Sequence, residues 1–434
     1  MDYKKKAAFY TLGCRVNQYE TESLKTQFTK RDYEVVEFNE KADVYVVNTC
    51  TVTNIADRKN RNILRRAKKI NSDAIVVATG CYAQTNPKDL EKMSEVDFVV
   101  GQSDKNNISE LVNNFEEYKN LKKVFVGNAF KYEKYDEMDF ASLRENAKAY
   151  VKIQDGCDRF CAFCKIPFAR GRKRSRDISD ILKECRDLVI AGYKEIVLIG
   201  IHLGAYGEDL DNKTTFDDVL EKILEIDGLK RLRISSIYPD TVTDRFIELL
   251  KNKKLMPHLH ISIQSADDLV LKMMRRRYDS TMLYNVLDKV RNNIEHIAFT
   301  GDVIVGFPYE AESNFLNTYN FINEFNFSDV HIFPYSDREK TIALGYKSKV
   351  NPMDKYDRFN RLNNLRKELT NKFLSRYLDE EVEILVEYSK NSKVAGYTKN
   401  FLKTKVENCD APLNEIIKFK PKKIVDEVLI GEYK

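Results

Sequence analysis

The sequence contains no run that approaches the ~18 uninterrupted apolar residues that a membrane span needs. Its first residues, MDYKKKAAFYTLGC, carry lysines but lack the apolar core and small-residue cleavage site of a signal peptide. We therefore expect a protein that stays where it is made, with the cytoplasm as the default and no membrane partner. Eight cysteines in 434 residues are also too few and too unevenly spaced for a disulfide scaffold, which favours metal binding or catalysis.

Net charge is only +5, so the overall charge balance favours no particular class of partner. Basic residues nevertheless gather in residues 58–69, 165–176 and 275–277. One such run is usually a solvated face, but three of them favour an anionic partner. The candidate contacts to the phosphate groups of such a partner are Arg58, Arg61, Arg65, Arg170, Arg172, Lys173 and Arg174.

The length of 434 residues suggests about three domains at ~150 residues each. The first, residues 1–116, alternates short apolar runs with helical patterns. The runs AAFYTL, VYVVN, AIVVAT and DFVVG predict strands, and helices are predicted over 18–31, 54–70 and 87–93. This alternation is typical of an α/β fold in which crossover helices connect a parallel sheet.

A cysteine follows each of the first three predicted strands, namely Cys14 in TLGC, Cys50 in NTC and Cys81 in TGC. The carboxyl ends of parallel strands lie along one edge of a sheet, so we expect these loops to be neighbours. Three converging thiolates can hold an iron–sulfur cluster with one open iron, and the small residues beside them permit close approach. Because long intervals separate these cysteines, three unrelated buried thiols are the alternative.

Residues 117–142 are charged, lack periodicity and are expected to form a linker. Strand and helix alternate again over residues 143–373, where YVKIQ, EIVLIG, RLRIS, LHISIQ, FTGDVIVG and VHIFP predict six strands. Six such units predict a partial (β/α)6 barrel rather than the closed eight-unit form. A helix is predicted over 353–378, with a packed face formed by Phe359, Leu362, Leu365, Leu369 and Phe373.

The apolar period changes to two in residues 374–434. Apolar side chains alternate with mostly acidic ones along the segment EVEILVEY, and the turn residues and aromatics of NSKVAGYTKNF follow. This pattern predicts a small all-β barrel. The alternating residues are Val382, Ile384, Val386 and Tyr388.

The densest cysteine motif, GCDRFCAFC, places Cys157, Cys161 and Cys164 just after the first strand of the predicted barrel. The spacing CxxxCxxC supplies three thiolates to a 4Fe-4S cluster and leaves one iron without a protein ligand. S-Adenosylmethionine can chelate that iron through its amino and carboxylate groups, and an electron from the cluster then releases a 5′-deoxyadenosyl radical. A zinc site completed by an outside ligand is the alternative, and the aromatic Phe160 and Phe163 favour the cluster.

Other polar or sulfur-bearing residues are weaker candidates. Gly200, His202 and Gly204 in LIGIHLGAYG follow the second barrel strand, where contact with S-adenosylmethionine is the prediction and packing of His202 the alternative. Cys185 lies on the apolar face of the helical segment SDILKECRDLVIAG and is expected in the core. Cys409 in KVENCDAP is expected in a loop or strand.

Five segments carry a resemblance to a known family. The segments are TLGCRVNQYETE, VNTCTVTNIADRK, TGCYAQ, QDGCDRFCAFCKIPFARGRKRSR and EVEILVEYSKNSKVAGYTKNF. In order along the chain, they resemble the motifs of the methylthiotransferases of the radical S-adenosylmethionine superfamily. Those enzymes have an N-terminal cluster domain, a radical core and a C-terminal RNA-binding TRAM domain, and the resemblance covers essentially the whole chain. It implies an auxiliary cluster and a radical cluster, held respectively by Cys14, Cys50 and Cys81 and by Cys157, Cys161 and Cys164.

TLGCRVNQYE, NTCTVT and HIFPYS are most similar to the type that methylthiolates N6-threonylcarbamoyladenosine immediately 3′ of the anticodon in tRNA. This resemblance implies two 4Fe-4S clusters and two molecules of S-adenosylmethionine per turnover, one that methylates sulfur and one that yields the radical taking hydrogen from adenine C2. It also implies tRNA, a flavodoxin- or ferredoxin-type electron donor and a sulfur source as partners. Because that C–H bond is unactivated, no acid–base pair could remove its hydrogen.

Some residues depart from the family pattern. Tyr238 stands where members commonly have Glu, Tyr309 where they have Gly, and Ala266-Asp267 where they have Gly-Ser. These positions lie in later barrel loops, so they bear on cofactor or substrate contacts and not on the clusters. Sister enzymes acting on isopentenyladenosine in tRNA or on an aspartate of a ribosomal protein are alternatives. A two-cluster electron carrier would need no six-unit barrel, and a non-catalytic RNA-binding module would need no open-iron motif.

Overall fold

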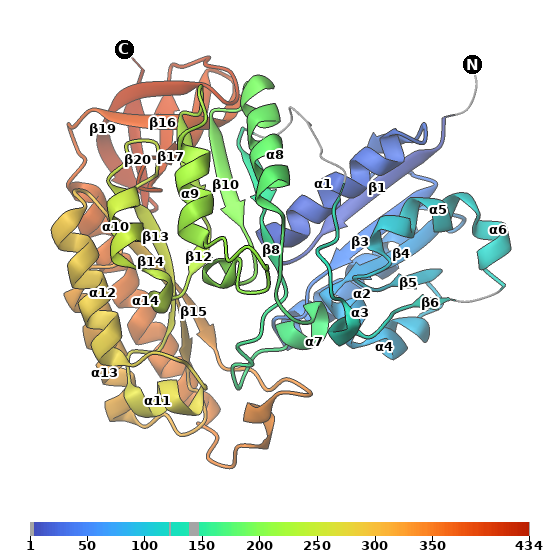
Figure 1. The fold of residues 1–434 in the computed structure, drawn as a ribbon, viewed down its shortest axis with the longest axis horizontal. Coiled ribbons are helices and arrows are strands. Elements are labelled where there is room, and N and C mark those ends of the chain that lie inside the picture. The colour runs from blue at the N-terminus through green and yellow to red at the C-terminus, as the bar shows by residue number, and fades with distance from the viewer. Residues whose placement is uncertain (1–3, 121–122, 139–146, 434) are drawn as a thin grey trace. The chain divides into compact units, whose positions relative to one another are not determined.

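The computed structural model describes residues 4–120, 123–138 and 147–433. Backbone contacts divide the chain into two compact units, which are described separately (Figure 1). Unit 1 comprises residues 1–143, 154–176 and 338–344. Unit 2 comprises residues 144–153, 177–337 and 345–434.

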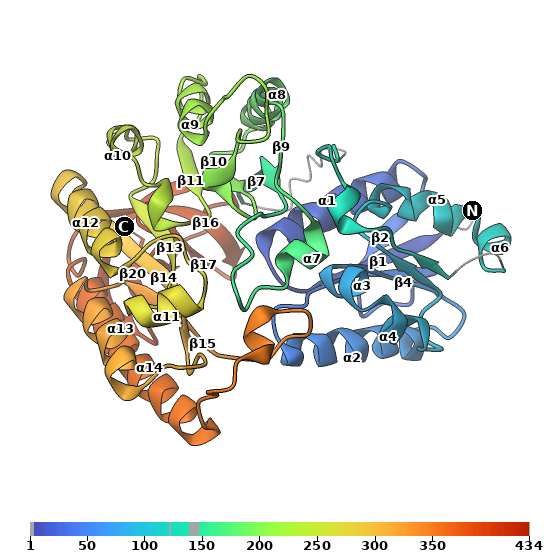
Figure 2. The same cartoon turned by 60° about the horizontal axis from the view of Figure 1, so that its bottom comes forward.

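Unit 1 is built on a six-stranded parallel sheet with the strand order β2-β1-β3-β4-β5-β6. Its strands are β1 (Lys6–Thr11), β2 (Glu34–Val36), β3 (Val44–Thr49), β4 (Ile75–Gly80), β5 (Phe98–Val100) and β6 (Val124–Phe125). Its helices in the same part of the chain are α1 (Arg15–Thr29), α2 (Asn54–Ile70), α3 (Cys81–Thr85), α4 (Pro87–Glu91), α5 (Ile108–Asn113) and α6 (Phe115–Tyr118). Figure 2 shows α2 and α4 on one side of this sheet and α1 and α5 on the other.

Both faces of the unit 1 sheet are buried, which explains why its strands are nearly continuous apolar runs. In β3, Tyr45 and Val47 belong to the apolar cluster that includes α2, whereas Val44 and Val46 belong to the cluster that includes α1. Successive side chains thus point to opposite faces of the sheet, and both faces are buried. Polar residues and cysteines lie at the carboxyl edge of the sheet.

The four strands predicted for this region are found as β1, β3, β4 and β5. The sequence reading missed the short edge strands β2 and β6 and the one-turn helix α3. Helix α1 begins at Arg15 rather than at residue 18, because its first turns bury the polar Asn17, Glu20 and Thr21, which apolar periodicity does not detect. The expected linker, residues 117–142, contains β6 and a 3-10 turn at Ala129–Lys131, and its residues 121–122 and 139–142 lie outside the described residues.

Unit 2 carries two parallel sheets, with strand orders β11-β10-β7 and β12-β13-β14-β15, and only Ser235 separates β11 from β12. The strands are β7 (Ala149–Lys152), β10 (Glu195–Ile199), β11 (Arg231–Ile234), β12 (Ser236–Ile237), β13 (His258–Gln264), β14 (Ala298–Val305) and β15 (Asp329–Pro334). The helices are α8 (Ile178–Ile190), α9 (Phe216–Leu224), α10 (Asp244–Leu250), α11 (Asp268–Met273), α12 (Ser280–Asn293), α13 (Glu312–Glu324) and α14 (Pro352–Ser375). All six predicted strands are present, which confirms the parallel α/β class of this region.

The C-terminal part of unit 2 is a closed barrel with the strand order β16-β17-β18-β20-β19. Its strands are β16 (Val382–Lys390), β17 (Lys393–Thr398), β18 (Lys403–Glu407), β19 (Ile416–Val425) and β20 (Val428–Glu432). The predicted small β-barrel is therefore confirmed. Val382, Ile384 and Val386 belong to its buried core, together with Cys409. Tyr388 is exposed, and the register shifts between Val386 and Tyr388.

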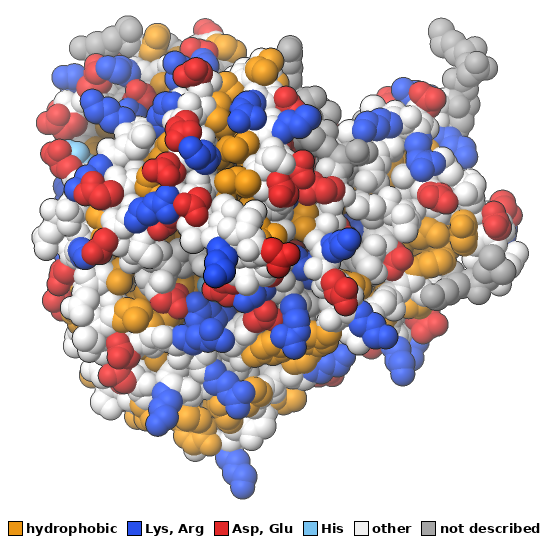
Figure 3. Space-filling model, in the orientation of Figure 1, with side chains coloured by type: hydrophobic (Ala, Val, Ile, Leu, Met, Phe, Trp, Pro, Cys, Tyr) orange, Lys and Arg blue, Asp and Glu red, His pale blue; other side chains and the backbone are white. Residues whose placement is uncertain are grey.

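Residues 154–176, which follow β7 directly, cluster with unit 1 and not with the sheets of unit 2. The compact units therefore divide the chain differently from the segments 1–116, 117–142, 143–373 and 374–434, and those domain boundaries stay a prediction. Charged side chains of both signs are intermixed over the face seen in Figure 3. Among the described residues, no helix combines the length and the apolar character that crossing a bilayer requires.

Candidate active site

Cys14, Cys50 and Cys81 lie at the carboxyl edge of the unit 1 sheet. Cys14 precedes α1, Cys50 follows β3, and Cys81 is the first residue of α3, directly after β4. Charge on Cys81 and on Cys14 acts on the Cys50 thiol, so the three sulfurs are electrostatic neighbours. The structure thus brings together three cysteines that are far apart in sequence.

The burial of two of these thiols and the mutual repulsion of all three favour a bound metal cluster at this position over three free thiols. Burial raises the pKa of Cys50 to about 12, and charge on Cys81 and Cys14 adds to the rise. Burial also raises the pKa of Cys81, while the nearby Arg170 opposes that rise. Cys50 and Cys81 are buried, whereas Cys14 is exposed. Because neighbouring thiolates repel one another and a coordinated thiol is deprotonated outright, a cation between them would stabilise all three, and Cys14, Cys50 and Cys81 would hold an iron–sulfur cluster here.

Two glycines next to the cysteines are required by the backbone. Gly13 has φ +100°, and a Cβ there would lie 2.8 Å from the Sγ of Cys50. Gly80 has φ +92°, and its Cβ would lie 2.4 Å from the Oδ1 of Asn48. A side chain at either position would be strained and would displace the cysteine loops. The motifs TLGC and TGC therefore need glycine directly before the cysteine.

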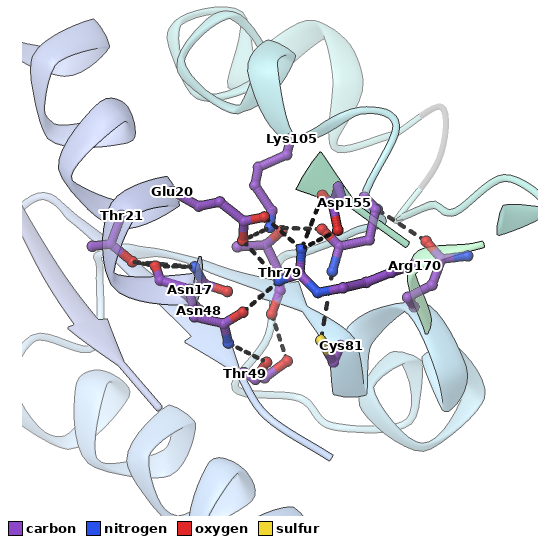
Figure 4. A network of polar contacts seen from close by, with 12 residues as sticks. Asn17, Glu20, Thr21, Asn48, Thr49, Thr79, Cys81, Lys105, Asp155 and Arg170 are labelled. Carbon is purple, nitrogen blue, oxygen red and sulfur yellow. Dashed lines mark hydrogen bonds and ion pairs between the residues drawn. The ribbon is translucent and has the colours of Figure 1, made fainter. Parts of the chain in front are cut away.

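A buried ion-pair network lies at the same edge of the sheet (Figure 4). Arg170, the last residue of α7 (Ile166–Arg170), donates from Nη1 to Glu20 Oε1 at 2.8 Å and Asp155 Oδ1 at 3.0 Å, and from Nη2 to Asn17 Oδ1 at 2.7 Å. Lys105 pairs with the other oxygen of Glu20. Burial alone would lower the pKa of Arg170, but Asp155 and Glu20 hold it well above its usual value. Two cations and two carboxylates therefore balance one another.

This network also reaches a cysteine of the first set. The amide of Gln102 lies 3.7 Å from the Sγ of Cys81, and its carbonyl oxygen accepts from Lys105 at 2.7 Å. The charges of Arg170 and Lys105 both favour the ionised form of Cys81. The network thus orients this thiol and supplies positive charge beside it.

We expect the Arg170→Met substitution to destabilise the protein by about 3–5 kcal/mol, because it leaves the buried carboxylates of Glu20 and Asp155 without their shared cation. Urea unfolding of the anaerobically purified protein, followed by circular dichroism, measures this change. Arg172→Met is the matched control, since the Arg172 side chain is 64% exposed and its removal should cost less than about 1 kcal/mol. Equal unfolding midpoints for the two variants would contradict the assigned role of Arg170.

Cys157, Cys161 and Cys164 occupy the turn between β8 (Gln154–Asp155) and α7, within unit 1. The turn is held by backbone bonds, from Cys157 N–H to Gly171 O at 3.1 Å and from Cys164 N–H to Cys161 O at 2.9 Å. Burial raises the pKa of Cys157 to about 11, the backbone N–H of Arg159 opposes this, and charge on Cys161 adds to it. Cys157 and Cys161 are buried and Cys164 is half-buried, so these neighbouring thiols also fit a cluster, to which the loop supplies three ligands.

Aromatic rings gather beside this loop. Phe160 stacks on Phe130 with ring centroids 6.2 Å apart, and Phe168 meets Phe130 edge-on at 5.9 Å. Phe130 lies in the segment that was expected to be a linker, and Phe163, the second predicted aromatic, is half-buried. Phe130 is exposed, and Phe160 and Phe168 are half-buried, so the three rings form a partly exposed aromatic cluster at this loop.

Gly200, His202 and Gly204 follow β10 in unit 2. His202 is buried, and its ring meets Tyr238 edge-on with centroids 4.4 Å apart. A Cβ on Gly204 would lie 2.0 Å from the Oγ1 of Thr241. These contacts support packing as one role of the loop, and the contact with S-adenosylmethionine stays a prediction.

The departures from the family pattern are accommodated within unit 2. Tyr309 has φ +70°, a left-handed conformation that glycine adopts without strain, and its ring lies 5.6 Å from that of Tyr346. Asp267 caps α11 by accepting from the Val270 N–H at 3.0 Å. It also accepts from the side-chain amides of Asn314, at 3.0 Å, and Asn317, at 2.8 Å.

The basic residues of α2 point in different directions. Arg58 and Arg65 are exposed, as phosphate contacts would need to be. Arg61 is half-buried and donates to the hydroxyl of Tyr82 at 2.7 Å. RNA contact therefore stays a prediction for Arg58 and Arg65, while Arg61 also supports the helix against Tyr82.

The basic residues after the radical motif divide into two pairs. Arg172 is exposed and Lys173 is half-buried. Arg170 and Arg174 are buried, and Arg174 donates at 2.9 Å to the backbone carbonyls of both Arg170 and Arg172. The predicted RNA contact is corrected for Arg170 and Arg174, because internal partners occupy their guanidinium groups and solvent does not reach them.

Sequence reasoning missed several buried polar residues of unit 1. Arg338 donates to Thr51 O at 2.9 Å and to Asp57 Oδ2 at 2.7 Å, next to Cys50, although it lies far along the chain. Glu20 and Lys105 were missed as well. A charged residue in a loop carries no periodic signal, and only the polar spacing of Asn17 and Glu20 in the first turns of α1 could have been noticed.

Comparison with known families defines the class of protein first. Residues 151–322 match the model described as "Radical SAM superfamily", and residues 6–101 match that described as "Uncharacterized protein family UPF0004". The three-cysteine turn before α7 lies inside the first of these matches. The chain is a radical S-adenosylmethionine enzyme with an additional N-terminal domain.

Curated relatives then define the family. The chain is 42% identical over 421 residues to "Threonylcarbamoyladenosine tRNA methylthiotransferase MtaB" of Bacillus subtilis, which covers 95% of this chain and 93% of the relative. The protein of that name from Aquifex aeolicus is 40% identical over 88% of this chain and 92% of its own length. The "tRNA-2-methylthio-N(6)-dimethylallyladenosine synthase" of Clostridium botulinum is 35% identical over 90% and 88%. The chain belongs to the radical S-adenosylmethionine methylthiotransferase family.

Solved structures show the same fold at low identity. The radical S-adenosylmethionine methyltransferase TsrM of Kitasatospora setae aligns with a TM-score of 0.56 and 14% identity, over 76% of this chain and 73% of that one. The cobalamin-dependent S-adenosylmethionine radical enzyme OxsB aligns with a TM-score of 0.53 and 14% identity, over 85% and 56%. At this identity the likeness concerns the fold alone.

Proposed function

We propose that this chain methylthiolates N6-threonylcarbamoyladenosine in tRNA, at the position immediately 3′ of the anticodon. The identity of 42% over 95% of the chain to the Bacillus subtilis relative carries this proposal. Two three-cysteine sets within unit 1 support it, because the reaction joins a radical step to a sulfur-transfer step. We place the activity in the cytoplasm.

The proposed site residues divide by task. Cys157, Cys161 and Cys164 hold one 4Fe-4S cluster, and Cys14, Cys50 and Cys81 hold the other. When bound, these clusters supply the electron that cleaves S-adenosylmethionine and the sulfur that is transferred to adenine C2. A second molecule of S-adenosylmethionine methylates that sulfur, so two molecules are used per turnover.

The chain's own groups orient and shield this chemistry. Arg170 and Lys105 keep positive charge next to Cys81, which favours its thiolate. Phe160 and Phe168, both half-buried, contribute apolar surface beside the radical motif. An acid–base pair could not remove the hydrogen at adenine C2, because that C–H bond is not acidic enough for proton abstraction. The proposed radical removes it instead.

The proposed partners follow from the same reaction. The tRNA backbone contacts the exposed Arg58, Arg65 and Arg172, and the C-terminal barrel with its exposed lysines provides a second RNA-binding surface. A flavodoxin- or ferredoxin-type protein donates electrons, and an external sulfur source restores the auxiliary cluster. Gly200, His202 and Gly204 contact S-adenosylmethionine.

A second candidate substrate is isopentenyladenosine in tRNA. The 35% identity to the Clostridium botulinum dimethylallyladenosine synthase, over 90% of this chain, favours keeping it. The two substrates differ in the group on N6, so nucleoside analysis distinguishes them directly.

Deletion of the gene is expected to remove 2-methylthio-N6-threonylcarbamoyladenosine from total tRNA and to leave N6-threonylcarbamoyladenosine, because the proposed enzyme adds the methylthio group to that precursor. Liquid chromatography with mass spectrometry of hydrolysed tRNA measures both nucleosides. Complementation with the wild-type gene or with Cys185→Ser, which changes a core cysteine outside both sets, should restore the product. An unchanged product peak in the deletion strain, or loss of only the isopentenyl form, would refute this substrate.

A further inference from the structure

We propose that His260, Asp302 and His331 form a binding site for a divalent transition-metal ion in unit 2, built from residues that belong to neither cysteine set. The three residues lie on the neighbouring parallel strands β13, β14 and β15 (Figure 2). Asp302 is paired in register with His331, and His260 with Thr300, two residues before Asp302. Because side chains alternate along a strand, all three point to the same face of the sheet.

The spacing of the three side chains matches metal coordination. His260 Nε2 lies 3.2 Å and His331 Nδ1 lies 3.3 Å from the same oxygen, Asp302 Oδ1. All three candidate ligand atoms lie within 4.8 Å of one another. Two ligands that are each about 2.1 Å from one ion are about 3.0–3.4 Å apart in octahedral or tetrahedral geometry, so an ion fits here without a large movement.

An outer hydrogen bond fixes one of the imidazoles. Thr300 Oγ1 lies 2.8 Å from His260 Nδ1 and 2.9 Å from His258 Nε2. If this hydroxyl donates to His258, it accepts from Nδ1–H of His260, which leaves the Nε2 lone pair facing Asp302. A metal-binding histidine usually has such a partner on its other nitrogen, and the ring of His258 is itself held by stacking on Phe401 at 4.7 Å.

The ligand set indicates which ions the site would take. Two imidazoles and one carboxylate suit Zn²⁺, Fe²⁺ or Mn²⁺, and three protein ligands leave coordination positions open for water or a substrate oxygen. The site is also accessible, because the side chain of His331 is 57% exposed and that of Asp302 is 25% exposed. The alternative to a metal ion is a proton shared between the histidines and Asp302, which would also hold these side chains close together.

Mn²⁺ is the suitable probe, because it prefers oxygen and nitrogen ligands to thiolates and does not compete for the cysteines. Cluster-loaded protein, with its clusters oxidised and therefore diamagnetic, is titrated with Mn²⁺ while electron paramagnetic resonance counts the free ion. We expect about one saturable Mn²⁺ per chain, displaced by Zn²⁺. Asp302→Asn, His331→Asn and His260→Asn should each weaken binding at least about tenfold.

His296→Asn is the matched control, since His296 is an exposed histidine of unit 2 outside the three strands and should bind Mn²⁺ like the wild type. Iron content and the midpoint of thermal unfolding are measured for every variant. Because the side chain of His331 is exposed, the His331→Asn variant should keep the stability of the wild type. Absence of saturable Mn²⁺ binding in the wild type would overturn the site and leave the proton as occupant. Equal affinity in the wild type and in a folded His331→Asn variant would overturn it as well.

Discussion

Replacing Cys157 by alanine is expected to abolish the release of 5′-deoxyadenosine from S-adenosylmethionine, with a loss on the order of a thousandfold or more. Cys157 sits in the turn between β8 and α7 with only two other cysteines, so its removal leaves two thiolates for a cluster that needs three. The anaerobically reconstituted protein should also fall from about eight irons per chain to about four. Chromatographic detection of 5′-deoxyadenosine, together with iron analysis, measures both effects.

Cys185→Ala is the control for this prediction. Cys185 is fully buried on α8, and its thiol belongs to neither set of three. Its loss creates a small cavity and costs about 1 kcal/mol, while cofactor cleavage should stay near the wild-type rate. Near-normal cleavage by the Cys157 variant would show that the radical cluster is held elsewhere.

Much of the fold could be predicted because apolar periodicity reports burial. The strands β3 and β4 are buried on both faces, and their runs VYVVN and AIVVAT are unmistakable. The edge strand β2 has three residues, of which the first two are exposed, so it leaves almost no apolar signal. Helix α3 has five residues, which is too short for a helical period to appear in the sequence.

The cysteine positions could be predicted because topology fixes the edge at which parallel strands end. Gly13 and Gly80 added a local signal, since their positive φ values allow the cysteine loops to approach. The supporting network could not be predicted in the same way. Arg170 lies in a run of basic residues that is typical of a solvent-exposed surface. Its ion-pair partners are Asp155 and Glu20, and Glu20 is 150 residues away in the sequence.

The same limit applies to the division of the chain. The radical motif follows β7 directly, yet residues 154–176 cluster with the N-terminal sheet. Arg170 explains part of this, because its partners Glu20 and Asn17 lie on α1. Contacts between segments distant in the sequence therefore place residues 154–176 in unit 1, whereas apolar periodicity alone predicts that they belong to the barrel.

Replacing Cys50 by alanine is expected to separate the two halves of the reaction. The variant should still release 5′-deoxyadenosine, because Cys157, Cys161 and Cys164 are untouched, but methylthiolated nucleoside should fall below about 1% of the wild-type amount. Cys50 is a better choice than Cys81, because Cys81 lies against the network of Arg170 and Lys105 and its loss would disturb those charges. Both products are measured in one anaerobic assay with tRNA, S-adenosylmethionine and a chemical reductant.

The control for Cys50 is Cys409→Ala, which removes a buried cysteine from the C-terminal barrel and should leave both products unchanged. Radical formation without sulfur transfer in the Cys50 variant would assign the sulfur step to the set of Cys14, Cys50 and Cys81. Full methylthiolation by that variant would exclude this assignment. Loss of 5′-deoxyadenosine in parallel with the methylthio product would instead show that the two sets act as one site, since a shared cluster or a shared local fold loses both activities together.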